Sequence, residues 1–249
     1  MSLSTVGLVG EVQIGFITRK GEQGERRVVI EESEGPSNSR WFTAKLADED
    51  GQDKQMTLGY TYLCHLSRAP DGTYEGGNHY DLQPNHPLRT QDEEGNEDKA
   101  KMCVEVLNSS QKLYKIHHAE YDPEYKYYGV GTALLQTVIE YSYEQGCEGR
   151  VILQTGRFGP HGFYYKLGMQ AKDEAVNRKI QEELTLAENE DRAPDTKSLG
   201  LVVMHLPSES LAKWKEHITE HPILYRTPEV FANLTKIQAV FAQQTEAAA

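Results

Sequence analysis

Two glycines stand one residue apart in the segment KYYGVGTALL, residues 126–135, directly before a run of good helix formers. A strand ending near Tyr121 and a helix beginning near Gly129 would leave the first amide hydrogens of that helix without partners inside the helix. Such amides attract anions, and glycine lacks the Cβ atom that would keep a phosphate away from the backbone. The segment therefore predicts a phosphate-binding site.

Several nucleotide-binding motifs share this arrangement, and the neighbouring residues distinguish them. The phosphate loop of NTPases requires the pattern G-x-x-x-x-G-K-[ST], which the sequence does not contain. The dinucleotide fingerprint requires another glycine at the position that Leu134 occupies. Both nucleotide-binding classes are therefore disfavoured.

The segment Lys126–Gly131 resembles the acyl-CoA signature of the GNAT superfamily of N-acetyltransferases, Gln/Arg-x-x-Gly-x-Gly/Ala, with Lys in place of the first residue. The longer run YDPEYKYYGVGTALL is similar to the family pattern V-x-P-x-Y-R-x-x-G-x-G-x-x-L-L. A second segment, FYYKLGM at residues 163–169, is similar to the family segment F-Y-x-x-L-G-F. The resemblance covers residues 112–169 well, and the flanking strands by pattern only.

The resemblance implies an acetyl-CoA site. In the family, strands four and five splay apart, and the pantetheine arm of the acyl donor lies between them. Carried over, the backbone of Ala119 and Tyr121 would pair with that arm as an added strand. Arg157 stands where many members have an Asn that contacts the pantetheine, so either Arg157 reaches a phosphate or the contact is lost. The resemblance implies that the amides of Tyr128, Gly129, Val130, Gly131 and Thr132 hold the pyrophosphate. Lys126 and Tyr127 of the same motif are further candidate cofactor-binding residues.

Acetyl transfer to nitrogen requires a neutral amine, whereas a lysine-like amine with a pKa of about 10.4 is almost entirely protonated near pH 7. A base must therefore take up a proton. Resemblance to arylalkylamine-type members of the family points to His117, four residues before Tyr121, with Glu120 as the alternative. Tyr164 matches the usual proton donor to the CoA thiolate. The competing readings are a structural His117, a solvated Glu120 and a Tyr164 that only packs beside the donor.

Other reactive side chains carry weaker signals. The three cysteines are widely separated, so neither a disulfide framework nor a zinc ribbon is indicated, and we expect a reducing, cytoplasmic context. Several histidines follow no recurring metal-ligand spacing, and we expect no metal site. These histidines are expected at the surface or in loops: His65, His79, His86 and His161.

β-rich segments precede the motifs. VQIGFIT and RVVIEE flank the turn-like KGEQGE, and RWFTAKLA and MTLGYTYLCHL flank DEDGQDK, which predicts two hairpins. The Gly-, Pro- and acid-rich stretch 68–99 predicts a long loop. Further strands are expected around MCVEVL and KLYKIHHAEY.

Helical patterns dominate the second half. Apolar residues recur at helical spacing over residues 129–144, so this helix is expected to pack on the sheet. RVILQT predicts a strand covered on both faces, followed by a short helix, a charged helix over residues 173–190 and a last strand at LGLVVMHL. Beyond Pro207, SLAKWKEHI and residues 227–241 are helical in pattern, the second with a Thr-Pro-Glu start.

Charge and length limit the protein classes. The chain has 249 residues and a formal net charge of −12, which argues against a nucleic-acid partner and favours a basic small molecule or peptide. Its first residues lack the features of a signal peptide, and no apolar run is long enough to span a bilayer. We therefore expect a cytoplasmic protein that does not bind membranes.

Together these patterns predict an α/β fold, with a GNAT-like mixed, largely antiparallel sheet flanked by helices and a C-terminal helical extension. Residues 1–207 would form the acetyltransferase domain, and residues 208–249 the extension docked on it. The predicted activity is transfer of an acetyl group from acetyl-CoA to a primary amine by direct attack. The alternatives are a non-catalytic acyl-CoA-binding regulatory module and a transferase for a longer acyl-CoA. A homodimer, common in the family, is a further expectation.

Overall fold

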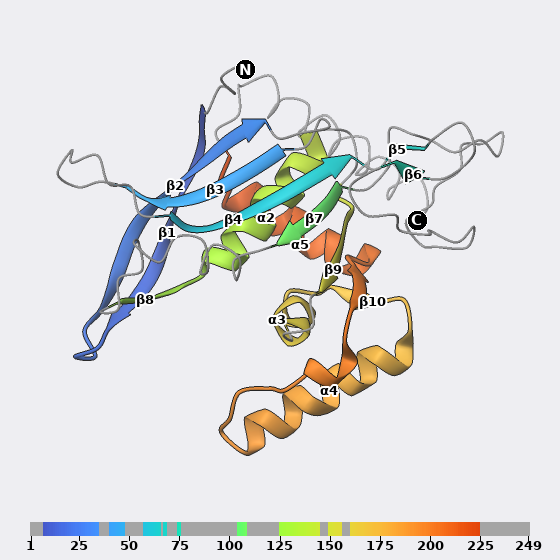
Figure 1. The fold of residues 1–249 in the computed structure, drawn as a ribbon. Coiled ribbons are helices and arrows are strands. Elements are labelled where there is room, and N and C mark those ends of the chain that lie inside the picture. The colour runs from blue at the N-terminus through green and yellow to red at the C-terminus, as the bar shows by residue number, and fades with distance from the viewer. Residues whose placement is uncertain are drawn as a thin grey trace, which may run out of the picture.

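The computed structural model describes residues 7–34, 40–47, 57–65, 67–68, 74–75, 104–108, 125–144, 149–155 and 160–224. A nine-stranded sheet dominates this part of the chain, with the strand order β10-β11-β9-β7-β4-β3-β2-β1-β8 (Figure 1). β7 and β9 run parallel to each other, whereas the other neighbouring strands run antiparallel. The sheet is therefore mixed and largely antiparallel.

The strands of this sheet are β1 (Gly7–Thr18), β2 (Gln23–Glu34), β3 (Arg40–Leu46), β4 (Thr57–His65), β7 (Val104–Asn108), β8 (Tyr125–Tyr128), β9 (Val151–Thr155), β10 (Gln170–Ala171) and β11 (Val202–His205). A separate two-stranded sheet pairs β5 (Ser67–Arg68) with β6 (Tyr74–Glu75). The helices are α2 (Val130–Glu144), α3 (His161–Lys166), α4 (Glu174–Asn189), α5 (Ser208–Glu220) and the 3-10 helix η3 (Lys197–Leu199).

The first four strands form a meander of two successive hairpins. Thr18 closes the β1–β2 turn, because its N–H donates to the Glu22 carbonyl at 2.8 Å and its hydroxyl accepts from the Glu22 N–H at 3.1 Å. Side chains alternate between the two faces of each strand. Ile30, Ala44 and Gly59 lie opposite one another on β2, β3 and β4, so they share one face.

Helix α2 packs on that shared face. A Cβ atom on Gly59 would lie 3.2 Å from atoms of both Val130 and Leu134, and the rings of Phe42 and Tyr141 meet edge to face at 5.4 Å. Ten consecutive residues of α2 are buried, from Ala133 to Ser142. The helix is therefore enclosed along most of its length rather than on one stripe only.

The second half of the described chain packs around β9 and β11 and continues the same core. Trp214 and Ile218 of α5 belong to the core cluster that contains α2, and the Trp214 indole N–H donates to the Leu167 carbonyl at 3.0 Å. α4 begins at Asp173, whose carboxylate accepts the Ala175 N–H at 2.8 Å as an N-cap. In the view of Figure 1, α4 lies below the sheet.

These elements confirm the predicted fold class. The two N-terminal hairpins, the helix after the double glycine, RVILQT, the charged helix and the strand within LGLVVMHL all form as expected. β8 was not predicted, because no strand was expected between Tyr121 and the helix that begins near Gly129. The expected strand at KLYKIHHAEY and the expected helix 227–241 lie outside the described residues, and the domain boundary at residue 207 stays a prediction. No helix in the described ranges has the length and apolar character needed to cross a bilayer.

Candidate functional site

The parallel strands β7 and β9 part at their C-terminal ends. Their ladder joins three residue pairs, the last of which is Val106 with Leu153. Beyond this pair, Leu107 and Asn108 remain paired with β4, while Gln154 and Thr155 remain paired with β11. Within the described strands, the sheet therefore opens between β7 and β9 while each keeps its outer neighbour.

Helix α2 begins at the same end of these strands. Its C-terminal end lies near the start of β9, because the Ser142 hydroxyl donates to the Arg150 carbonyl at 2.9 Å. Its N-terminal end contacts α3, which follows β9 in the chain, through Gly131 and Phe163. The first turn of α2 therefore lies toward the open end of the β7–β9 pair.

Gly129 makes the sharp entry into α2. Its φ angle of 92° is one that side-chain-bearing residues rarely adopt, and a Cβ atom there would have only Ile14, at 3.9 Å, as a neighbour among the described residues. The helical hydrogen bonds begin with the Ala133 N–H and the Gly129 carbonyl, 2.8 Å apart. The amides of Val130, Gly131 and Thr132 thus precede the ladder, as an anion site at a helix N-terminus requires.

Gly131 has a different neighbour. A Cβ atom on this residue would lie 2.8 Å from Cζ of Phe163, closer than real Cβ contacts. The Phe163 ring is 37% exposed and meets the Tyr164 ring edge to face, with ring centres 5.1 Å apart. Tyr164 itself is 3% exposed and belongs to the hydrophobic core. Phe163 therefore touches both the first turn of α2 and Tyr164.

His161 anchors the start of α3. It is fully buried, and its Nδ1 and Nε2 atoms each lie 3.0 Å from a partner, the Thr196 hydroxyl and the Gly200 carbonyl respectively. A carbonyl only accepts, so Nε2 carries the hydrogen, and Nδ1 of the neutral ring accepts from Thr196. Burial lowers the pKa of His161, while the bond to Gly200 acts in the opposite direction. The expectation of a surface or loop position for His161 is wrong.

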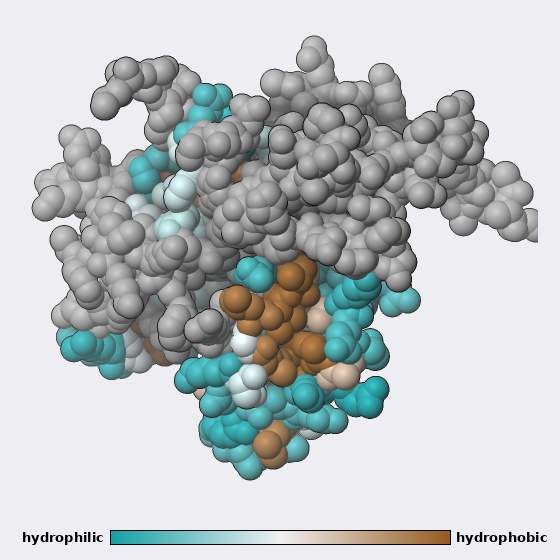
Figure 2. Space-filling view, turned by 45° about the vertical axis from the view of Figure 1, so that its right-hand side comes forward, coloured by the Kyte–Doolittle hydropathy of each residue, from teal (hydrophilic) through white to brown (hydrophobic). Residues whose placement is uncertain are grey.

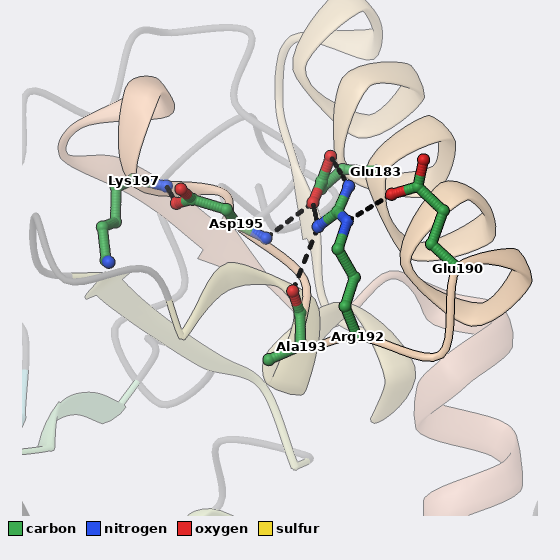
Figure 3. Close-up of polar contacts among 6 residues, drawn as sticks. All are labelled: Glu183, Glu190, Arg192, Ala193, Asp195 and Lys197. Atoms are coloured by element: carbon green, nitrogen blue, oxygen red, sulfur yellow. Dashed lines mark hydrogen bonds and ion pairs between the residues drawn. The ribbon is translucent and has the colours of Figure 1, made fainter.

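The segment that carries Thr196 is fixed by an arginine network (Figure 3). The Arg192 guanidinium binds Glu183 through both terminal nitrogens, at 2.7 and 3.3 Å, and binds Glu190 through Nε at 2.5 Å. Glu183 also accepts the Asp195 N–H at 2.6 Å. Hydrogen bonding to Arg192 holds the pKa of Glu183 below its ordinary value. These contacts hold the chain after α4 in place beside His161.

Apolar side chains also reach the surface in the second half of the described chain. Figure 2 shows them gathered on one face, with the polar residues of α4 below them. The large apolar side chains that are exposed in the described residues include Phe163, Leu186 and Leu201. Of these three, Phe163 adjoins the first turn of α2.

The other sequence-predicted site residues fall into two groups. Tyr127 and Tyr128 lie on β8, where they pair with Phe16 and Gly15 of β1; Tyr127 is half-buried and Tyr128 is 47% exposed. Lys126 pairs through its backbone with Ile17. The structure thus brings the predicted pyrophosphate residues and Tyr164 to the same end of the sheet. Outside the described residues lie His117, Ala119, Glu120, Tyr121 and Arg157.

Comparison with known proteins supports the resemblance. Residues 80–169 match the model of the acetyltransferase (GNAT) family. This stretch is similar to GNAT acetyltransferases. It contains both KYYGVG and FYYKLGM, and it indicates the superfamily of acyl-CoA-dependent acetyltransferases. A search of curated proteins and a search of solved structures gave no match.

Sequence reasoning missed one feature of this candidate site. Among the described strands, β7 borders the opening beside β9, and the predicted pantetheine contacts Ala119 and Tyr121 lie outside the described residues. The contact between Gly131 and Phe163 was missed because the glycine was interpreted only through a bound phosphate. Phe163 opens the second family motif, but that motif carries no signal for a contact with Gly131. Among the described residues, no group of three or more potential ligands is arranged to hold a metal.

Proposed function

We propose that this protein is an N-acetyltransferase that moves an acetyl group from acetyl-CoA to a primary amine by direct attack. The observation that carries the proposal is the meeting of two family motifs beside the opening between β7 and β9. The first turn of α2 comes from one motif, and Phe163 and Tyr164 come from the other. The family match connects this arrangement with acyl-CoA chemistry.

The first turn of α2 suits a pyrophosphate. Three backbone amides precede the helical ladder, the first turn contains no acidic residue, and the space beside Gly129 is open among the described residues. The partial positive charge of a helix N-terminus favours an anion there. We assign pyrophosphate binding to the amides of Val130, Gly131 and Thr132, with Lys126 and Arg157 as candidate cationic partners.

In the reaction, the nitrogen of the neutral amine attacks the thioester carbonyl carbon. The C–N bond forms, the C–S bond breaks, and the amine loses one proton. We assign that proton to His117, with Glu120 as the alternative base, and we assign protonation of the departing thiolate to Tyr164. A thiol has a pKa near 8.5, so an acid assists this departure without being indispensable. Because Tyr164 is almost fully buried, its role requires the hydroxyl to border the opening between the strands.

The acceptor we propose is a cationic amine, either a small molecule or the amine of a peptide. The net charge of −12 favours the approach of such a molecule, because long-range attraction raises the encounter rate of opposite charges. The amine must then lose its charge before it attacks, which makes the base necessary.

The direct test incubates the full chain with acetyl-CoA and a panel of polyamines, amino acids and lysine peptides while free thiol is measured. We expect amine-dependent thiol release and an acetylated product by mass spectrometry. Tyr164→Phe is expected to lower kcat roughly tenfold or more with CoA affinity retained, since only proton donation is lost. CoA binding without thiol release for any amine would instead favour the non-catalytic module. Faster turnover with a longer acyl-CoA would favour the other alternative.

A further inference from the structure

We propose that Phe163 is a positioning residue, whose ring, seated on Gly131, sets the distance between the first turn of α2 and Tyr164. This inference rests on the proposed function, because Tyr164 is the assigned proton donor. It gives the two glycines of the motif separate roles. Gly129 allows the backbone turn into the helix, and Gly131 makes room for a ring.

A side chain at position 131 would require the Phe163 ring to move. A Cβ atom there would lie 2.8 Å from Cζ and 3.5 Å from both Cε atoms of Phe163, whereas ordinary contacts begin near 3.4 Å. The ring therefore rests directly on the backbone of the first turn. Its tip faces α2, and the ring also meets the Tyr164 ring edge to face.

Other close contacts hold the rest of α3 in place. A Cβ atom on Gly162 would lie 2.8 Å from Cδ2 of Leu184, so α3 sits against α4 as closely as Phe163 sits against α2. His161 is bound through both ring nitrogens, and Tyr164 is buried in the core. A methyl group at position 131 would therefore displace the Phe163 ring and disturb its contact with Tyr164.

The alternative interpretation is that Gly131 lacks a side chain so that a phosphate can approach the backbone. A methyl group at position 131 would then mainly weaken CoA binding. The amide hydrogens of the first turn point along the helix axis, toward the side of Gly129, where the described residues leave space. The Cβ direction of Gly131 points to Phe163 instead. A methyl group there meets the aromatic ring, so its main consequence is at Tyr164 rather than at the phosphate.

A double-mutant cycle separates the two interpretations. It compares the wild type with Gly131→Ala, Phe163→Leu and the double variant, and it measures kcat, the KM for acetyl-CoA, CoA affinity by calorimetry, and the ring signals of Tyr164 in ¹³C-tyrosine-labelled protein. Tyr164→Phe assigns those signals. Gly15→Ala is the matched glycine control, because a Cβ atom there has no described neighbour within 4 Å.

We expect Gly131→Ala to shift the Tyr164 signals and to lower kcat about tenfold with CoA affinity within about twofold, since small misplacements of catalytic groups are costly. Adding Phe163→Leu should remove the clash, so the double variant should match Phe163→Leu alone in its Tyr164 signals and in kcat, without an additive loss. Should Gly131→Ala not fold, Phe163→Leu alone is expected to shift the same signals and lower kcat without raising the KM for acetyl-CoA.

The proposal is overturned by unchanged Tyr164 signals in Gly131→Ala and Phe163→Leu. It is also overturned by a CoA affinity that falls equally with and without Phe163, which is the phosphate outcome. Absence of thiol release from the wild type would instead refute the proposed function. The Tyr164 signals in the resting protein still report whether Phe163 positions that ring, so the two failures are distinguishable.

Discussion

The two ends of α2 differ in how their polar groups are satisfied. Toward the C-terminal end, Glu140 is 6% exposed, and its carboxylate accepts the N–H groups of Ile223 and Leu224 at 2.9 and 2.7 Å. It also accepts from Gln136 at 2.8 Å. At the N-terminal end, the first three amides precede the helical ladder beside an open space at Gly129.

This difference indicates that the C-terminal end of α2 stabilises the fold. Gln136 donates to the His221 carbonyl at 2.6 Å, and the segment after α5 continues to β1, where Leu224 bridges Gly10. The C-terminal half of α2 therefore joins α5, β1 and the core. Its N-terminal turn has donors arranged for an anion. We infer that stability and ligand binding are separated along one helix.

Removal of the Glu140 carboxylate should have the largest effect. Glu140→Ala would leave two buried N–H groups without their acceptor, at a cost of about 3 kcal/mol in the free energy of unfolding. Glu140→Gln, which keeps one acceptor oxygen, should lose about half as much. Urea unfolding measures both, and CoA affinity of the folded variants should remain unchanged. A Glu140→Ala variant of wild-type stability would break the proposed separation.

A side chain at Gly129 should weaken binding more than stability. Gly129→Val places a β-branched residue at a φ of 92°, so the entry turn must change and the first-turn amides must reorient. We expect CoA affinity to fall about a hundredfold, by analogy with the cost of small misplacements. Calorimetry measures it, with Gly15→Val as the control in a strand. Equal CoA affinities for Gly129→Val and Gly15→Val would show that the pyrophosphate does not bind at this turn.

Acidification should weaken the packing of α3. Burial lowers the pKa of His161 from its ordinary 6.5, so between the two values the unfolded chain binds more protons than the folded one. Stability due to this group is therefore complete above pH 6.5 and falls as the pH drops below it, by at most about 1.4 kcal/mol per pH unit. His161→Gln should show a shallower loss between pH 6.5 and 5 in urea unfolding. Parallel curves would show that His161 does not titrate in this way.

A new negative charge in the first turn of α2 should have the smallest effect. It should raise the stability of the fold and lower the affinity for CoA. Thr132→Asp places a carboxylate near the positive end of the helix, which should stabilise the fold by about 0.5 kcal/mol. The same charge should repel a bound pyrophosphate and weaken CoA affinity about fivefold. Thr132→Asn is the neutral control of the same shape. Tighter CoA binding by Thr132→Asp than by Thr132→Asn would contradict an anion site.

Local patterns predicted most of the fold, and contacts distant in sequence account for what was missed. β-rich segments on either side of turn-like segments predicted the hairpins, and helical spacing predicted α2 and α4. β8 is an edge strand paired with the end of β1, and a pairing across about a hundred residues has no local signature. His161 was misplaced for a related reason, because its partners Thr196 and Gly200 lie beyond α4.

The part of the site that follows from local motifs could be predicted from the sequence. The part that follows from side-chain packing could not. The double glycine indicated an anion site, and the structure gives Gly129 the backbone conformation that such a turn needs. Nothing in the spacing of Gly131 and Phe163 indicated that they touch. The hydrogen bonds from Ile223 and Leu224 to Glu140 were also not predictable, because a carboxylate in the middle of a helix usually faces solvent.

The most direct test follows the backbone amides of α2 by NMR while CoA is added to the full chain. We predict that the signals of Val130, Gly131 and Thr132 shift in a saturable way, while those of Glu140 and Ser142 stay in place. Saturable CoA binding that leaves the three first-turn amides unmoved would contradict the assignment of this helix end as the acyl-CoA site.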